Sequence, residues 1–135
     1  MKKAILILLW LLCVSALPSF AAEDPFKVVY RQDNVVNDGL KTSFNLMINV
    51  INLSGDEARS LMVTIPGQNP FLPMDMPVFV GTIPDGHQSE VLQQAKISNA
   101  LIALSDPEEN LLWRVEYTNS AGEKTFVDVK GERGI

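Results

Sequence analysis

The sequence contains a single cysteine and a single histidine. Cys13 lies in an apolar stretch near the N-terminus, so the chain beyond it has no thiol, which excludes disulfides, thiolate metal sites and cysteine nucleophiles there. His87 follows the turn residues Pro84 and Gly86, where an imidazole is solvated rather than oriented in a cleft as acid–base catalysis requires. These absences predict a protein that is not an enzyme and that carries no cofactor.

Basic residues are also scarce. The chain has 11 Lys and Arg against 16 Asp and Glu, for a formal net charge of −5. Nucleic-acid binding needs a cluster of cations that displaces counterions from the phosphate backbone, and the sequence has no such cluster. The composition therefore argues against nucleic acid and against an anionic membrane surface as partners.

The N-terminus has the order of a signal peptide. Lys2 and Lys3 precede an apolar run at residues 4–17, and the small residues Ser19 and Ala21 follow; this order is typical of an export signal with its cleavage site. We expect cleavage after Ala21, with cleavage one residue later as the alternative. A membrane span needs about 20 apolar residues, and the run at residues 4–17 is shorter, so a permanent anchor is disfavoured. The sequence predicts a signal peptide at residues 1–21, a periplasmic or secreted location, and no stable membrane insertion after processing.

The remaining residues, 22–135, are enough for one domain and too few for two well-filled cores. Apolar and polar side chains alternate with a period of two through several short runs, which predicts strands. These runs cover residues 26–31, 41–53, 58–65, 78–83, 111–118 and 125–129. Turn residues separate them, notably at 37–39, 84–86 and 119–122, so the last two runs form a hairpin.

Two segments are harder to interpret. Residues 89–104 combine strand spacing with helix-forming residues, and we expect two short strands with a bend near Asn99. Residues 131–135 form a polar tail without an anchoring signal. About seven short strands and no long helix predict an all-β fold, an immunoglobulin-like antiparallel β-sandwich, with a small closed barrel as the alternative.

Four stretches carry a resemblance to a known family. They are VINLSG at residues 50–55, ARSLMVTIP at 58–66, VGTIPDG at 80–86 and RVEYTNSAGE at 114–123. In this order they resemble the immunoglobulin-like domains of bacterial surface proteins described as cell-adhesion-related, over most of residues 26–130. The chain departs from that pattern at residues 68–77 and after Gln88. The resemblance implies a scaffold and no shared active site.

An apolar loop is the main candidate for a contact surface. Three prolines between residues 67 and 77 disfavour regular structure, and the apolar residues around them commonly mark a partner site when they are exposed. The predicted partner-binding residues are Phe71, Leu72, Met74, Met76 and Val78. The alternative is that the loop folds over one sheet and buries them.

Other candidate sites are weaker. Met74, Met76 and His87 offer ligands that suit copper, but packing explains the methionines better. Asp106, Glu108 and Glu109 offer oxygen ligands for calcium without the order of a calcium loop. No metal site is therefore predicted.

Two further patterns bear on carbohydrate. Asn52 begins a sequence that matches the N-glycosylation pattern by chance. A carbohydrate platform would need exposed rings such as Trp113 or Tyr117, which the alternation directs inward.

The sequence thus predicts an exported, non-catalytic binding or structural module of the bacterial cell envelope. It is expected to act through protein–protein contact at the loop of residues 71–78 or at an unpaired sheet edge. The alternative is a small periplasmic protein that binds carbohydrate or metal.

Overall fold

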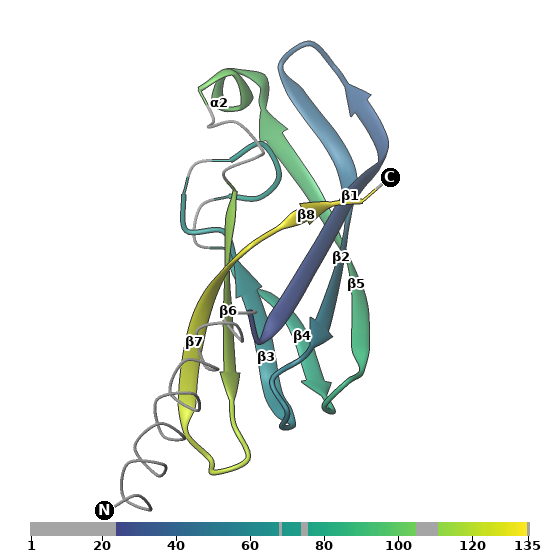
Figure 1. The fold of residues 1–135 in the computed structure, drawn as a ribbon. Helices are drawn as coiled ribbons and strands as arrows, with labels where there is room; N and C mark the ends of the chain where they lie inside the picture. Colours follow the sequence, from purple (N-terminus) through teal and green to yellow (C-terminus); the bar gives the residue numbers. More distant parts are fainter. Residues whose placement is uncertain (1–23, 68, 74–75, 105–110, 135) are drawn as a thin grey trace, which may run out of the picture.

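The computed structural model describes residues 24–67, 69–73, 76–104 and 111–134, so the predicted signal peptide lies outside the described part. The chain forms a two-layer β-sandwich (Figure 1). Its elements are β1 (Phe26–Asn37), β2 (Lys41–Asn52), β3 (Ala58–Thr64), β4 (Val78–Ile83), β5 (Gln88–Ser98), α2 (Asn99–Ala103), β6 (Leu112–Thr118), β7 (Lys124–Lys130) and β8 (Glu132–Arg133).

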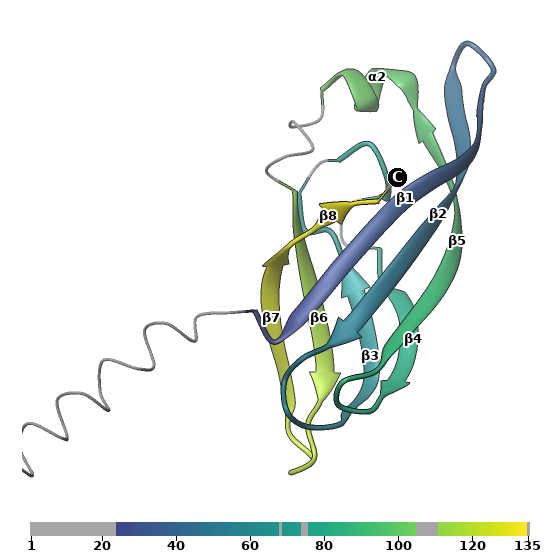
Figure 2. The same ribbon diagram turned by 45° about the vertical axis from the view of Figure 1, so that its right-hand side comes forward.

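Each layer is a four-stranded sheet. One sheet has the order β5-β2-β1-β8 and the other has the order β4-β3-β6-β7. All pairings are antiparallel except that of β8 with β1, which is parallel. The predicted all-β sandwich is confirmed, with eight strands in place of about seven. Both sheets keep open edges, so the closed-barrel alternative is wrong (Figure 2).

The core follows the predicted alternation. Every second side chain is buried from Phe26 to Tyr30 in β1 and from Phe44 to Asn52 in β2, while the residues between them are more exposed. A strand directs successive side chains to opposite faces, so a period of two gives one buried face per sheet. The fully buried side chains from the two sheets include Phe26, Val28, Tyr30, Leu46, Ile48, Val50, Leu61, Val63, Trp113 and Val115.

Aromatic rings join the two sheets across this core. Tyr30 of β1 lies 5.3 Å from Trp113 of β6, measured between ring centroids. Phe26 of β1 meets Tyr117 of β6 edge to face at 4.8 Å. Such pairs contribute about 0.5–1.5 kcal/mol beyond the area they bury. They therefore hold the layers together in a domain whose described residues contain no cysteine.

The segment at residues 89–104 differs from the prediction. It forms one long strand, β5, and then a single helical turn, α2, rather than two strands. The reason lies in Asn99, whose backbone N–H donates to the Leu40 carbonyl at 2.9 Å. Its side-chain oxygen accepts the Thr42 hydroxyl at 2.6 Å, and its amide donates to Asn37. These bonds fasten the end of β5 to the β1–β2 hairpin, beyond which β2 offers no further pairing.

The C-terminal tail also differs from the prediction, because it is anchored. Glu132 and Arg133 form β8 alongside β1, and the Gly134 N–H donates to the Tyr30 carbonyl at 2.7 Å. Lys27 pairs with Glu132 at 3.3 Å. The chain thus leaves one sheet after β7 and joins the other (Figure 1). A two-residue strand has no periodicity that a sequence could reveal.

Asn52 is a buried hydrogen-bonding residue and not a glycosylation site. Its amide nitrogen donates to the carbonyls of Asp56 and Ile83 at 2.7 and 2.8 Å, and its side-chain oxygen accepts from Ser54. A fully buried side chain with these partners is closed to a glycan. It joins the end of β2 to the end of β4. No helix among the described residues is long and apolar enough to cross a membrane.

The passage between sheets depends on Gly131. A Cβ at this position would lie 2.3 Å from Trp113 Nε1 and 2.8 Å from Tyr30 Cε1. Overpacking of this kind costs about 1–3 kcal/mol, so we expect Gly131→Ala to lower the free energy of unfolding by that amount. The matched control is Gly67→Ala, where nothing lies within 4 Å of the added Cβ and φ is not positive. Chemical denaturation of both variants measures the difference, and equal stabilities would contradict the close approach.

Candidate functional site

The predicted apolar contact surface does not exist in the form expected. Phe71, Leu72 and Val78 are 0%, 1% and 4% exposed, so they belong to the core. Met76 is partly buried and packs against the same core, while Met74 lies outside the described residues. The exposed surface predicted at Phe71, Leu72 and Val78 is therefore wrong, and the alternative of a loop folded over the sandwich is correct for these three residues.

Asn69 explains why the loop folds inward. Its buried side-chain oxygen accepts the N–H groups of Phe71 and Leu72 at 2.9 and 2.7 Å. This arrangement satisfies backbone donors that would otherwise be buried without partners. The Phe71 ring can then pack edge to face on Tyr30 at 5.0 Å and on Phe44 at 6.5 Å.

The metal hypotheses gain no support. Met76 precedes the start of β4 and His87 follows its end, so a strand of about 20 Å separates them. The His87 ring contacts the Asp85 carbonyl in an exposed turn. Asp106, Glu108 and Glu109 lie outside the described residues. Within the described part of the chain, no group of three His, Cys, Asp or Glu residues is placed to hold a metal ion.

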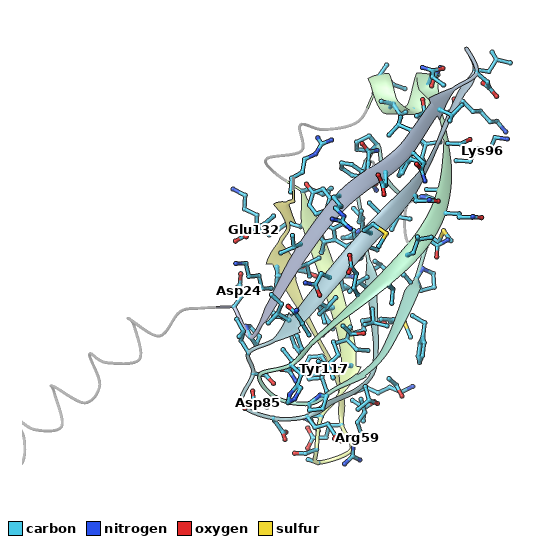
Figure 3. The ribbon with its side chains drawn as sticks, turned by 90° about the vertical axis from the view of Figure 1, so that its right-hand side faces the viewer. Asp24, Arg59, Asp85, Lys96, Tyr117 and Glu132 are labelled. Atoms are coloured by element: carbon cyan, nitrogen blue, oxygen red, sulfur yellow. The ribbon has the colours of Figure 1, made fainter. Side chains whose placement is uncertain are left out.

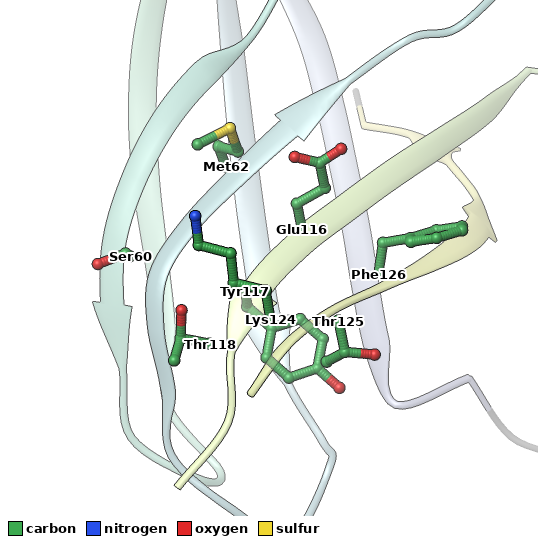
Figure 4. A pocket seen from close by; sticks show the side chains of 8 residues that line it. All are labelled: Ser60, Met62, Glu116, Tyr117, Thr118, Lys124, Thr125 and Phe126. Atoms are coloured by element: carbon green, nitrogen blue, oxygen red, sulfur yellow. The ribbon is translucent and has the colours of Figure 1, made fainter. Parts of the chain in front are cut away.

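A pocket lies instead on the outer face of the β4-β3-β6-β7 sheet (Figure 4). Its volume is about 400 Å³. Each of three neighbouring strands contributes two outward side chains to its wall: Ser60 and Met62 from β3, Glu116 and Thr118 from β6, Lys124 and Phe126 from β7. Apolar, hydroxyl and charged groups are thus combined in one hollow, as in ligand or partner sites.

A β-bulge at Ser60 shapes the β3 side of the pocket. Arg59 pairs with Thr118 of β6, and Met62 pairs with Glu116. Between these two pairs β3 therefore contains one residue more than β6. Ser60 takes up the extra residue with φ of 50°, a left-handed conformation that is rare for serine. Bulges interrupt the ladder and redirect side chains, and they are frequent beside functional sites.

Beyond the bulge, a row of side chains crosses this sheet. The strand register places Phe79 beside Met62, Met62 beside Glu116, and Glu116 beside Phe126. Phe79 and Phe126 are 66% and 60% exposed, so both ends of the row present an aromatic ring to solvent. Figure 4 shows Met62, Glu116 and Phe126 projecting from neighbouring strands. We call these four residues the outer-face row.

Charged groups around the row differ in their pairing. Arg114 lies over the Phe126 ring, 4.8 Å from its centroid, and forms a two-bond contact with Asp128 at 2.9 and 3.3 Å. The Arg114 guanidinium, held by Asp128, therefore covers one face of the Phe126 ring. Glu116 and Lys124 form no ion pair with other described residues. Opposite charges therefore stand unpaired on the pocket wall.

The turn next to the pocket is held in place by Asp56. This carboxylate accepts hydrogen bonds from the hydroxyl and the backbone N–H of Ser120 in the β6–β7 turn. The hydroxyl bond is the largest cause of a lowered pKa for Asp56, since it favours the charged form. Asp56 also caps the β2–β3 turn through the Glu57 N–H, so the two turns form one end of the sandwich.

The sequence contained part of this site. The alternation that directs Trp113 inward is confirmed, because Trp113 is fully buried, and Tyr117 is half-buried at the pocket wall. The same alternation places Phe126 and Glu116 outward. An aromatic ring on an otherwise polar face was therefore the sequence feature that could have indicated this site. The bulge at Ser60 had no signal, because serine gives no indication of positive φ.

Comparison with known proteins shows the fold alone. No protein-family model matches the chain, and no curated protein matches it. The chain is similar to part of a GH20 exo-β-N-acetylglucosaminidase from Vibrio harveyi in complex with N-acetylglucosamine, with a TM-score of 0.51 and 10% identity. An inactive mutant of that enzyme gives 0.50 and 10% identity. Both matches cover 82% of this chain and 18% of the enzyme. A structural genomics target gives 0.45 at 15% identity, covering 80% of this chain and 84% of the target.

The strain at Ser60 is testable. Glycine adopts positive φ without a Cβ clash, so we expect Ser60→Gly to raise the free energy of unfolding by about 0.5–1 kcal/mol. The control is Ser89→Gly in β5, where φ is not positive and the glycine should destabilise by a similar amount. Denaturant unfolding of both variants checks the signs. A loss of stability at both positions would contradict the left-handed bulge.

Proposed function

We propose that this chain is an exported, non-catalytic binding module of the cell envelope that contacts a protein partner through the outer-face row and its pocket. The observation that carries the proposal is the pocket of about 400 Å³ beside the strained bulge at Ser60. A left-handed serine costs about 1–3 kcal/mol, and strain of this kind persists where the surrounding structure and its use require it.

The exposed rings support a protein partner. Interface centres are enriched in aromatic residues, methionine and arginine, and the row with Arg114 supplies all three types. Phe126 is supported by Arg114, so less conformational entropy is lost when a partner covers it. The partner that fits presents an apolar side chain to the space between Met62 and Phe126, flanked by charges that pair with Glu116 and Lys124.

The strand arrangement supports an immunoglobulin-like assignment. The chain crosses between sheets after β2, after β4, after β5 and after β7, and β6 and β7 form a hairpin at one edge of the second sheet. Crossings of this kind are the Greek-key connections that immunoglobulin and fibronectin type III sandwiches share. Domains with this scaffold act widely as binding modules, which is an argument by analogy. Export rests on the signal-peptide pattern of residues 1–21.

A second candidate is carbohydrate binding. The observation that favours it is that an exposed Phe126 ring lines the same pocket as the hydroxyls of Ser60 and Thr118, because a sugar offers both an apolar face and hydroxyl groups. The similar Vibrio harveyi enzyme was solved with N-acetylglucosamine, although the likeness to it is one of fold. The two candidates use the same surface and differ in ligand chemistry.

The test compares matched surface variants. Phe126→Asp places a charge in the outer-face row, while Leu40→Asp makes the same kind of change at a side chain 79% exposed in the β1–β2 turn. The chain as recovered from its cells is used to capture partners from envelope extract. We expect one protein to bind both the wild type and the Leu40 variant. The same protein should bind the Phe126 variant at least about tenfold more weakly, because this variant loses a side chain buried in the interface.

Two results would reject this account. If the Phe126 variant captures the protein as well as the wild type does, the outer face is not the contact surface. If the wild type captures no protein, the proposal of a protein partner is rejected. Calorimetric titration with N-acetylglucosamine oligomers provides the second arm. Saturable heat that Phe126→Asp abolishes would favour carbohydrate over protein.

A further inference from the structure

The strand β5 forms an open edge of the first sheet. It is 11 residues long and pairs with β2 on one side, while no other strand pairs with it among the described residues. It contains neither proline nor a recorded bulge in its register with β2. Proteins usually shorten, twist or cover an edge of this length, because its free N–H and C=O groups can pair with another strand. Figure 3 shows β5 along the side of the molecule, with Lys96 on its outer surface.

The hydrogen bonds at both ends of β5 reveal which residues face the open edge. The Asn52 N–H donates to the His87 carbonyl, and the Asn99 N–H donates to the Leu40 carbonyl. Odd-numbered residues therefore direct their backbone groups toward β2, because N–H and C=O of one residue point to the same side in an antiparallel ladder. The even-numbered residues direct theirs outward: Gln88, Glu90, Leu92, Gln94, Lys96 and Ser98.

We infer that a second copy of this chain docks on this edge, so that two β5 strands pair antiparallel about a two-fold axis at Gln93. Self-pairing of an open edge is isologous, and each residue contact then occurs twice. With Gln93 on the axis, Leu92 lies opposite Gln94 of the second copy and Glu90 lies opposite its Lys96. Every outward N–H and C=O between residues 88 and 98 then has a partner.

Charge complementarity selects this register from the others that the ladder allows. An axis at Leu92 would place Glu90 opposite Gln94, and an axis at Gln94 would place it opposite Ser98. The axis at Gln93 alone among these three brings Glu90 and Lys96 together, and symmetry repeats the pair. Opposite charges directly across a pair of strands stabilise the pairing, whereas like charges there destabilise it. Glu90 is half-exposed and lies 3.6 Å from Arg31, a contact that the second copy leaves in place.

The same register also covers an exposed apolar side chain. Leu92 is 53% exposed in the monomer and lies beside Met47 of β2. In the paired edge the Leu92 side chains of the two copies are diagonal neighbours on one face, within reach of each other at about 7–8 Å. Docking requires one local change, because Gln93 Nε2 donates to the outward Gln94 carbonyl at 3.0 Å in the single chain. In the dimer the Gln94 carbonyl accepts the Leu92 N–H of the second copy in place of the Gln93 side-chain amide.

The experiment uses charge reversal at the paired positions. Sedimentation equilibrium of the chain as recovered from its cells should show a monomer–dimer equilibrium. Glu90→Lys and Lys96→Glu each create two like-charge contacts, so each variant alone should raise the dimer dissociation constant by about tenfold or more. The double variant should return toward the wild-type value. Lys130→Glu, at an exposed position of β7 on the other sheet, should leave it unchanged.

Mixing the two single variants tests the symmetry itself. A Glu90→Lys copy facing a Lys96→Glu copy has opposite charges at both contacts, so the mixture should form heterodimers as tightly as the wild type. Hydrogen exchange adds a readout of the strand, since the amides of Leu92 and Gln94 should gain protection as concentration rises.

Three results would overturn the inference: a monomer at all concentrations, a dimer that neither reversal weakens, or single variants that fail to recover on mixing. Its failure would leave the outer-face proposal standing, because the two surfaces lie on different sheets.

Discussion

The contacts between aromatic rings from opposite sheets are the interaction on which this structure depends. Tyr30 of β1 meets Trp113 of β6, and Phe26 meets Tyr117 farther along the same two strands. Sandwiches of this kind often carry a disulfide across the layers, whereas the described residues here contain no cysteine. Burial of large rings among aliphatic side chains therefore ties the layers together without a covalent link, and it requires close backbone approach at Gly131, where the chain crosses between them.

The same packing leaves both outer faces free for other uses. Inward residues supply the core, so the outward positions of β3, β6 and β7 can hold a bulge, two exposed rings and unpaired charges without loss of the fold. On the first sheet no strand among the described residues pairs with the outward backbone of β5. Function in such a domain belongs to surface features placed on a rigid scaffold. The two proposals assign these surfaces to a partner protein and to a second copy.

The sequence predicted the features that arise from alternation. The inward residues of β1, β2, β3 and β6, the turn at Gly39 and the final hairpin are confirmed, because each rests on local periodicity or turn chemistry. It was wrong where long-range contacts decide. Phe71 and Leu72 look exposed in sequence but are drawn inward by Asn69, and residues 132–133 pair with a strand about one hundred positions away. The Ser60 bulge has no local signature, and of the pocket beside it only the outward Phe126 and Glu116 follow from the alternation.

The most direct test of the central claim is a double-mutant cycle between Phe26 and Tyr117, each changed to leucine to keep an apolar side chain. The account predicts a coupling free energy of about 0.5–1.5 kcal/mol between the two positions, measured from the unfolding of the single and double variants, because the rings interact across the layers. A coupling indistinguishable from zero would contradict the claim that ring contacts between the sheets hold the sandwich together.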